Sequence, residues 1–496
     1  MSGRPDGPLV RRTDDVLRPD PARVISRPFL PGQEIVEARR SSRSSAVLER
    51  VLALSDTEVD DTLERTLRSY GSRHRDLAAT WDARFPLVAH LVDDAASLSP
   101  ARRRLVGATF SSEYALEAAA LFNPSMVAHP DQSGLPLGAV RFVMTVRAVG
   151  EGHVSSVEFR TGTVDGDLVC FDDPGVLVGG PQLVPTTYRR AVFVQQLAAL
   201  EGDDGDAEVL AAALPEQFGR EELDRAMSVL RASAATGATR LQLSIQRLEW
   251  IAACNYTVEF ESEWGLGERV LLPTSPAESH GLEDVRLVRH TDDDGSVEYR
   301  GIYTAFDGVR VAPQLLRTVD FHTFHVAQLS GTAATDKGMA LFPRPVGGRA
   351  FALSRHDRES NSLAESDDGV RWDVVTTLQV PQRPWELVQL GNCGPPVETR
   401  DGWLVLTHGV GPMREYSIGA LLLNLEDPRK VIGQLHEPLL TPTADERDGY
   451  VPNVLYSCGA LLHDDTLVLP YGCSDASIRV ALVHVPQLLA RLTSLR

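Results

Sequence analysis

Residues 281–287, with the sequence GLEDVRL, place two carboxylates, Glu283 and Asp284, beside the guanidinium of Arg286. A carboxylic acid can protonate a leaving group, and a neighbouring cation controls how readily it gives up its proton. On a surface turn, the same residues would form only solvated ion pairs of little energy. The segment therefore predicts either a charged turn or a catalytic site, and the rest of the sequence has to decide between them.

Polar and charged residues also crowd the ends of several other apolar, strand-like segments. In a β-propeller, strand ends and loops from different blades meet at one mouth of the central channel. Residues that are far apart in the sequence could then line one pocket, which favours a site over a surface turn. The polar and charged residues at these strand ends are Asn123, Arg147, His153, Lys337, Arg355, Glu359, Glu398, His408, Arg414, Tyr416 and Asp475.

The elements that must position these residues are short strands. After Asn123, runs rich in β-branched and aromatic residues, such as GAVRFVMTVRAV and GWLVLTHGV, alternate with turn sequences such as HTDDDGS. Strands at this density, without regular alternation with helices, predict an all-β architecture for residues 121–496. That length exceeds one sandwich of about 100 residues and suits a propeller. Residues 188–250 interrupt the strands and predict a helical insertion.

The first 120 residues differ in character. Residues 46–120 have helical periodicity, with Ser55 and Glu58 in capping-box spacing. We expect an N-terminal helical segment that packs against the main domain or against a second subunit, as in a homo-oligomer. Residues 1–45 are rich in Arg, Pro, Asp and Ser, with little periodicity, and predict a disordered arm.

Charge and composition argue against several classes of protein. The 496 residues include 49 basic and 68 acidic ones, giving a net charge of −19, which repels nucleic acid and anionic membranes. No apolar run reaches the roughly 18 residues of a membrane span, and the N-terminus lacks the apolar stretch of a secretory signal. The five cysteines include no C-x-x-C pair. We therefore expect a cytoplasmic protein with free thiols and without nucleic-acid or membrane partners.

The segments GLEDVRL, KGMALFP, GWLVLTHGV, YSIGALLLNLEDPRKVIG and YVPNVLYSCG resemble glycoside hydrolase family 130, which comprises β-mannoside phosphorylases and related β-1,2-mannosidases. The resemblance runs from Asn123 to the C-terminus, apart from the insertion. It implies a five-bladed β-propeller, and the N-terminal helices resemble those of longer members. The usual E-D-P-R of the family reads E-D-V-R here, so this loop lacks a proline that would restrict φ.

The resemblance also implies roles for the acidic segment. Asp284 matches the proton donor of the family, which in the phosphorylases acts through a sugar hydroxyl. Arg286 would orient Asp284 by pairing and keep Glu283 ionised. The candidate substrate-binding residues are Asn123, Arg147, His153, Glu283, Arg286, Tyr416 and Asp475.

The two activities of the family need different residues. Hydrolysis with inversion needs a second carboxylate, about 6.5–9.5 Å from the acid, to activate water, and Glu359 and Glu398 are the candidates beside Asp284. Phosphorolysis instead needs cations that hold the anionic phosphate. The candidate phosphate ligands are Lys337, Arg355, His408 and Arg414, for which ion pairing with neighbouring acids is the alternative role.

Clustered cations in so acidic a chain favour phosphorolysis of β-mannosides, with inversion to α-mannose 1-phosphate. A β-1,2-mannosidase with a carboxylate pair stays open, as does a non-catalytic sugar-binding propeller. The sequence has no H-E-x-x-H, EF-hand, Walker or Rossmann motif. We expect no metal and no cofactor, inorganic phosphate as the co-substrate, and a mannose-containing oligosaccharide as the substrate.

Overall fold

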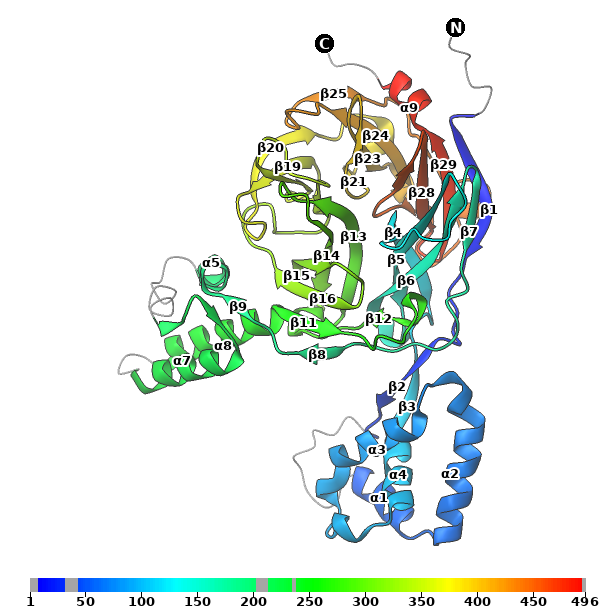
Figure 1. Cartoon of the computed structure of the whole chain (residues 1–496), viewed down its shortest axis with the longest axis vertical. Coiled ribbons are helices and arrows are strands. Elements are labelled where there is room, and N and C mark those ends of the chain that lie inside the picture. Colours follow the sequence, from blue (N-terminus) through cyan, green and yellow to red (C-terminus); the bar gives the residue numbers. More distant parts are fainter. Residues whose placement is uncertain (1–7, 32–42, 202–212, 234–237, 493–496) are drawn as a thin grey trace. The chain divides into compact units, whose positions relative to one another are not determined.

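A computed structural model describes residues 8–31, 43–201, 213–233 and 238–492 of the chain (Figure 1). The chain divides into two compact units. The helical unit comprises residues 20–118 and 175–179, and the β unit comprises residues 1–19, 119–174 and 180–496. No helix in the described ranges is long and apolar enough to cross a membrane.

The helical unit packs four helices around a core that includes Leu48, Val59, Trp81 and Leu105. Ser55 and Glu58 form the capping box that their spacing predicts, because each side chain bonds to the backbone N–H of the other residue. The elements of this unit are β2 (Val24–Pro28), α1 (Arg43–Leu52), α2 (Asp56–Tyr70), α3 (Leu77–Val88), α4 (Pro100–Thr109) and β3 (Ser111–Ala115).

The β unit is built mostly of antiparallel strands. Its apolar runs, which alternate with turn sequences, predict such strands. Its largest sheet joins two antiparallel groups through a single parallel pair, Gly281 with Ser155. Gly281 is required there, since its φ is +136° and a Cβ atom would lie 2.7 Å from the Ser155 nitrogen. The strands are β4 (Ala120–Ala128), β5 (Ala139–Val149), β6 (Ser155–Asp165), β7 (Leu168–Phe171), β8 (Gln182–Val184), β11 (Tyr256–Glu259), β12 (Val270–Leu271), β13 (Gly281–Thr291), β14 (Val297–Phe306), β15 (Val311–Thr318) and β16 (Thr323–Gln328).

Three smaller antiparallel sheets complete the strand-rich part, and Figure 1 shows the groups following one another around the β unit. Buried aliphatic and aromatic residues fill the space between neighbouring sheets, with Trp403 and Leu421 in one such cluster and Leu469 and Tyr471 in another. The sheets are β17 (Ala340–Leu341), β18 (Ala350–Ser354), β19 (Asn361–Ser366) and β20 (Asp373–Gln379); β21 (Gln389–Asn392), β22 (Val397–Thr399), β23 (Gly402–Val410), β24 (Tyr416–Leu423) and β25 (Val431–Gln434); and β26 (Leu455–Tyr456), β27 (Leu461–His463), β28 (Thr466–Cys473) and β29 (Ser477–His484) with β1 (Val10–Leu17).

The predicted disordered arm is wrong for residues 8–31. Strand β1 pairs antiparallel with β29, from Val10 opposite Val483 to Leu17 opposite Ile478, and β2 pairs with β3. The reason is tertiary: Val10 and Leu17 pack on two different apolar clusters of the β unit, a contact that the local sequence pattern does not reveal. The other residues of that prediction, 1–7 and 32–42, lie outside the described residues.

The insertion between β8 and β11 contains helices α5 (Arg190–Glu201), α7 (Arg220–Ser233) and α8 (Ala238–Cys254), with the short strands β9 (Tyr188–Arg189) and β10 (Gln217–Phe218). Its core includes Phe193, Leu223 and Leu248. The Gln196 side chain at α5 donates to the carbonyl of Gln328, 2.6 Å away, and so fastens the insertion to β16. The all-β prediction is therefore correct for the sheets, which carry a helical appendage.

Candidate active site

Two β-bulges bring the acidic segment together with a distant asparagine. The register of β13 shifts between Glu283 and Arg286, and Asp284 in this bulge has a φ of +58°. Strand β4 has a matching shift at Asn123, whose φ is +51°. In this geometry the Asn123 side-chain amide donates to Asp284 Oδ1. Bulges turn side chains out of a sheet, and strained non-glycine backbone is found often at functional sites.

Arg147, at the end of β5, holds both carboxylates of the segment. Its Nη1 donates to Asp284 Oδ1 at 3.1 Å, and its Nη2 donates to Glu283 Oε1 at 2.6 Å. Its Nε donates to Ser155 Oγ at 2.8 Å, which fixes the guanidinium plane. Lys337 pairs with the other Glu283 oxygen. Glu283 is thus held between two cations, while Asp284 is held by one cation, Arg147, and by the amide of Asn123.

Asp284 is ionised before substrate arrives. Burial acts to raise the pKa of its carboxyl, but the charges of Arg147, Lys337 and Arg286, together with the Asn123 hydrogen bond, outweigh burial and hold the pKa below its ordinary value. A proton donor at this position therefore needs an incoming group that opposes these cations.

Arg286 was expected to pair with Asp284, but its hydrogen bonds go to other residues. Its Nη1 donates to the Asn392 carbonyl at 3.0 Å, and its Nη2 donates to Tyr456 Oη at 2.5 Å. These contacts hold the buried guanidinium away from a direct pair with Asp284, which it influences through charge. The expected orienting pair is therefore not formed, and in the described contacts the orienting groups of Asp284 are Arg147 and Asn123.

Arg355 and His408 form a second part of the site. The His408 Nδ1 lies 3.2 Å from the Asn392 carbonyl, which can only accept, so Nδ1 carries the proton and Nε2 faces Arg355 Nη1 at 3.4 Å. Burial, followed by the charges of Arg355 and Arg286, lowers the pKa of His408 well below its usual value. The lowered pKa favours a neutral imidazole over the cation expected from the sequence, and its Nε2 faces Arg355.

Close packing supports this arrangement. A Cβ atom at Gly391 would lie 2.7 Å from His408 Cε1 and 3.1 Å from Arg355 Cδ, so a glycine lets β21 approach both side chains. The ring of Tyr416 stacks on His408 with 5.8 Å between centroids. A Cβ atom at Gly338 would lie 3.6 Å from Arg355 Cβ and 3.9 Å from Arg286 Nη2, which places Arg355 beside Arg286 and next to the Lys337 segment.

Asp475 lies close enough to Asp284, Arg147 and Arg414 for their charges to act on its carboxyl. Asp475 has a φ of +50°, and burial, followed by the charge of Asp284, raises its pKa to about 6 against the opposing charges of Arg147 and Arg414. The Arg414 guanidinium lies 5.9 Å from the Tyr416 ring centroid. His153 Nδ1 is 2.9 Å from Tyr450 Oη, and Val451, next to Tyr450, donates its N–H to the Ser474 carbonyl.

Known proteins are similar to the part of the chain that contains Asp284, Arg355, His408 and Asp475. The model of glycoside hydrolase family 130, described as beta-1,4-mannooligosaccharide phosphorylase, matches residues 257–493. A 1,2-beta-oligomannan phosphorylase of Thermoanaerobacter sp. (strain X514) is 34% identical over 228 residues, which cover 44% of this chain and 74% of that protein. The chain belongs to glycoside hydrolase family 130.

Further relatives in family 130 cover similar parts of the chain. A beta-1,2-mannobiose phosphorylase of Listeria innocua is 30% identical over 229 residues, covering 45% of this chain and 63% of that protein. The solved structure of the Listeria innocua beta-1,2-mannobiose phosphorylase with beta-1,2-mannobiose has a TM-score of 0.45 and 20% sequence identity, covering 76% of this chain and 93% of that one. The family match begins after the helical insertion, so Asn123 and Arg147 lie in the part of the site that precedes it.

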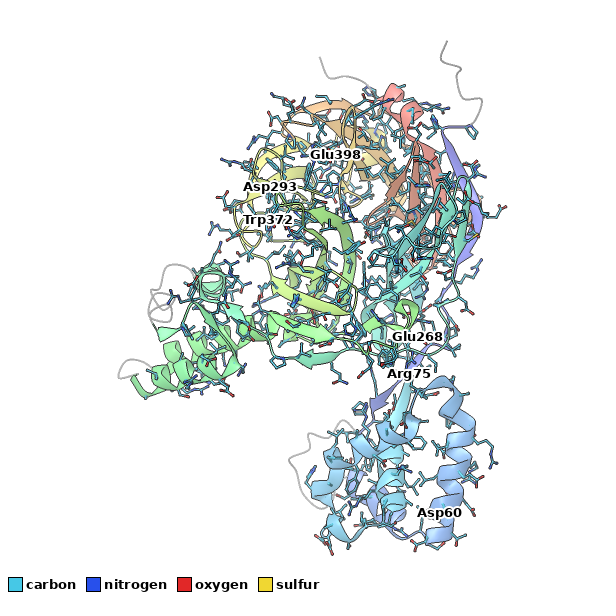
Figure 2. The ribbon with its side chains drawn as sticks, viewed as in Figure 1. Asp60, Arg75, Glu268, Asp293, Trp372 and Glu398 are labelled. Carbon is cyan, nitrogen blue, oxygen red and sulfur yellow. The ribbon has the colours of Figure 1, made fainter. Side chains whose placement is uncertain are left out.

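Two carboxylates expected in the family 130 site, Glu398 and Glu359, are exposed. Glu398, labelled in Figure 2, is opposite Trp403 on β23, five positions from His408, which is about 17 Å along a strand. It forms an exposed ion pair with Arg344 at 2.6 Å. Glu359 is exposed in the turn between β18 and β19, and its described contacts are those of its backbone. The position of Glu398 does not fit a carboxylate that acts together with Asp284, whereas a catalytic role for Glu359 stays a prediction.

The sequence reading missed two residues that organise this family 130 site. Asn392 accepts from Arg286 through both its carbonyl and its side-chain oxygen, and its amide donates to the Gly338 carbonyl at 2.8 Å. Tyr456 bonds to Arg286, and its ring centroid is 4.8 Å from that of His408. Tyr456 lies in YVPNVLYSCG, a segment that carries the family resemblance, which was the available signal for it. Within the described residues, no group of three or more His, Cys, Asp or Glu side chains could hold a metal ion.

Proposed function

We propose that the chain is a β-mannoside phosphorylase, which cleaves a β-mannoside with inorganic phosphate and inversion to give α-mannose 1-phosphate. Family 130 membership and the phosphorylase names of its relatives support this activity. The observation that carries the choice of phosphate over water is Arg355, a partly buried cation that has no carboxylate partner among the described residues.

The charge balance around Asp284 supports an anionic co-substrate. Arg355 Nε is buried without a hydrogen-bond partner in the described chain, and Nη1 makes only the 3.4 Å contact with the neutral His408. A desolvated guanidinium without a counter-ion is costly. A phosphate beside Arg355 would supply the missing counter-ion and could also reach Lys337, which pairs with Glu283, and each charge-assisted hydrogen bond could contribute about 1.5–3 kcal/mol.

The same anion would prepare the acid. With phosphate bound, the positive field that keeps the pKa of Asp284 low is partly cancelled, so its carboxyl can take up, by way of solvent, the proton that the hydrogen phosphate gives up. The proton then passes from Asp284 to the glycosidic oxygen, through a sugar hydroxyl as in related phosphorylases. The C1–oxygen bond breaks while a phosphate oxygen bonds to C1 from the opposite face, which inverts the anomeric centre.

The remaining side chains suit sugar binding. Asn123, in the bulge of β4, offers an amide, and Asp475, in the turn between β28 and β29, offers a carboxyl. Arg414, Tyr416 and His153 are further candidates for contacts with the sugar. Asp475, with its raised pKa, can donate or accept a hydrogen bond to a sugar hydroxyl near neutral pH.

We also propose that the β unit is a five-bladed propeller. The strands form five antiparallel groups in the described chain: β4–β5–β6, β13–β16 with β11, β17–β20, β21–β25, and β26–β29 with β1. The single parallel pair at Gly281 is what joins the first two groups into one sheet. Asp284, Arg355, His408 and Asp475 come from or beside four of these groups, as residues of a central channel would.

A second candidate function rests on Asp475. Its pKa of about 6 suits a general base, so Asp475 could activate water and make the chain a β-mannosidase. The test is incubation with β-1,2-mannobiose and β-1,4-mannobiose, with and without phosphate. Mannose 1-phosphate formed only with phosphate supports the phosphorylase. Free mannose at the same rate in both conditions supports the mannosidase and contradicts the proposal.

A further inference from the structure

A buried carboxyl group, that of Glu278, lies shortly before the strand that carries Asp284. Glu278 ends the short helix η6 (Pro276–Glu278), and its side chain is fully buried. A carboxyl group that is removed from water needs hydrogen bonds to its oxygens. The partners of Glu278 therefore show which parts of the chain it holds together.

Four donors converge on the Glu278 carboxyl. The backbone N–H groups of Thr274 and Ser275 each donate to Oε2 at 2.8 Å. The hydroxyl of Tyr256, on β11, donates to Oε1 at 2.8 Å, and the hydroxyl of Tyr303, on β14, donates to the same oxygen. Glu278 thus joins two strands of the largest sheet to the segment that leads into β13.

Tyr303 stands opposite the bulge that contains Asp284. In the register of β13 with β14, two residues, Asp284 and Val285, are opposite the single residue Tyr303. Val285 and Tyr303 belong to the same buried apolar cluster. A Cβ atom at Gly301 would lie 3.0 Å from Val285 Cγ1, so the bulge lies close against β14. Tyr303 is therefore the residue of β14 that faces the bulge, and Glu278 fixes its hydroxyl end.

The bulge needs such support, because its backbone is strained. Asp284 has a φ of +58°, which is unfavourable for a residue other than glycine and persists where the surrounding structure holds it. Residues 282–287, with the sequence LEDVRL, include neither glycine nor proline, so the local sequence does not impose this conformation. The contacts with β14 must supply what the local sequence lacks.

A similar carboxyl group occurs in the sheet of β21–β25. The short helix η7 (Pro384–Glu386) ends in a fully buried glutamate, which accepts the N–H of Arg383 at 3.1 Å. This glutamate stands six residues before Asn392, the same spacing as from Glu278 to Asp284. In both sheets, a buried carboxyl group fixes the chain before a strand that carries a residue of the site.

We propose that Glu278 and Tyr303 are positioning residues for the proton donor. Through Tyr303, Glu278 holds the bulge that places Asp284 against Arg147 and Asn123. The inference rests on the proposed role of Asp284 in phosphorolysis.

The test compares Tyr303→Phe with Tyr256→Phe, its matched control. Each variant removes one hydrogen bond to the same oxygen of Glu278, but only Tyr303 faces the bulge. Tyr303→Phe should lower kcat on β-mannobiose roughly ten- to hundredfold, the cost of a small misplacement of a catalytic group, and should leave the KM for phosphate within about twofold. Tyr256→Phe should leave both constants within about twofold. Equal values of kcat in the two variants would overturn the inference.

A double mutant tests whether Tyr303 acts through Asp284. In the Asp284→Asn background, Tyr303→Phe should change the residual rate by less than about twofold, because the group that it positions is already absent. A further loss as large as the loss in the wild-type background would show that Tyr303 acts on another part of the site, contrary to the inference.

Crystal structures of the two phenylalanine variants separate this inference from the proposed function, since they do not depend on activity. Tyr303→Phe should lose the positive φ at Asp284 and the contact of Asp284 with Arg147, whereas Tyr256→Phe should keep both. A bulge that persists in Tyr303→Phe overturns the inference. Absence of cleavage of every β-mannoside by the wild type would instead count against the proposed function.

Discussion

Two acid–base pairs of the β unit have similar chemistry and opposite surroundings. The pair of Glu283 and Arg147 joins side chains that are 7% and 17% exposed, whereas the pair of Glu398 and Arg344 joins side chains that are 40% and 38% exposed. In both, the guanidinium approaches the carboxylate to 2.6 Å. The distance is the same, so distance alone does not distinguish a structural pair from a site.

Burial and the neighbouring charges make the difference. Glu283 is buried beside a second carboxylate, Asp284, and there the charges of Arg147, Lys337 and Arg286 outweigh burial and hold the pKa of Asp284 below its ordinary value. The exposed pair of Glu398 and Arg344 is solvated and screened by salt, and contributes little. The comparison predicts that equivalent mutations will have very unequal effects in the two places.

The largest effect is expected at Asp284. Asp284→Asn removes the proposed proton donor but keeps the size of the side chain and its position beside Asn123 and Arg147. We expect kcat to fall by roughly 10² to 10⁴, with the circular dichroism spectrum unchanged. Turnover near the wild-type rate on an unactivated mannoside would remove Asp284 from the mechanism.

The next effect concerns phosphate. Lys337→Ala leaves Glu283 paired with Arg147 and should raise the Michaelis constant for phosphate roughly ten- to hundredfold, as expected for one charge-assisted contact. The constant for the mannoside should change much less. Arg344→Ala, at the exposed pair, is the control and should change neither. A change confined to the sugar constant would place Lys337 at the sugar.

A smaller effect should appear in the pH dependence of the free energy of unfolding. The folded chain raises the pKa of Asp475 from its ordinary 3.8 to about 6, so the folded state binds the proton more tightly than the unfolded state does. Stability from this group is complete below about pH 4 and is lost as the pH rises to about 6, by up to about 3 kcal/mol. Asp475→Asn should therefore gain stability relative to wild type between pH 4 and pH 7. Parallel melting curves across that range would contradict this.

The smallest effect is expected at the exposed pair. Glu398→Gln should leave kcat/KM within about twofold and should change the free energy of unfolding by less than about 1 kcal/mol. Denaturant titration and initial rates measure both. A loss of activity comparable to that of Asp284→Asn would return Glu398 to the site and erase the contrast between the two pairs.

Much of the fold follows from local signals in the sequence. The capping box of Ser55 and Glu58 marks a helix start, because it depends on residues three positions apart. Short runs of β-branched and aromatic residues likewise predict strands, because this signal depends on residues that are close together in the sequence. Strand β1 could not be predicted, since its stability comes from pairing with β29 at the other end of the chain.

The sequence predicted correctly that several residues at strand ends lie close together. It could not predict which end of a strand faces the site. Asp284, Arg147, Lys337 and Arg355 lie together, as their positions at strand ends suggested. Glu398 lies in the short strand β22, opposite Trp403 near the start of β23 and away from His408. Sequence alone does not say which end of a strand faces the site. Nor does it give the protonation of His408, which depends on burial among distant residues.

The most direct test of the central claim is a phosphate titration of initial rates at a fixed, saturating concentration of β-mannobiose, with both products quantified. The account predicts a rate that rises from near zero and saturates with phosphate, one mannose 1-phosphate formed for each bond cleaved, and the α-anomer as the first product. A rate that does not depend on phosphate, with free mannose as the product, would contradict it.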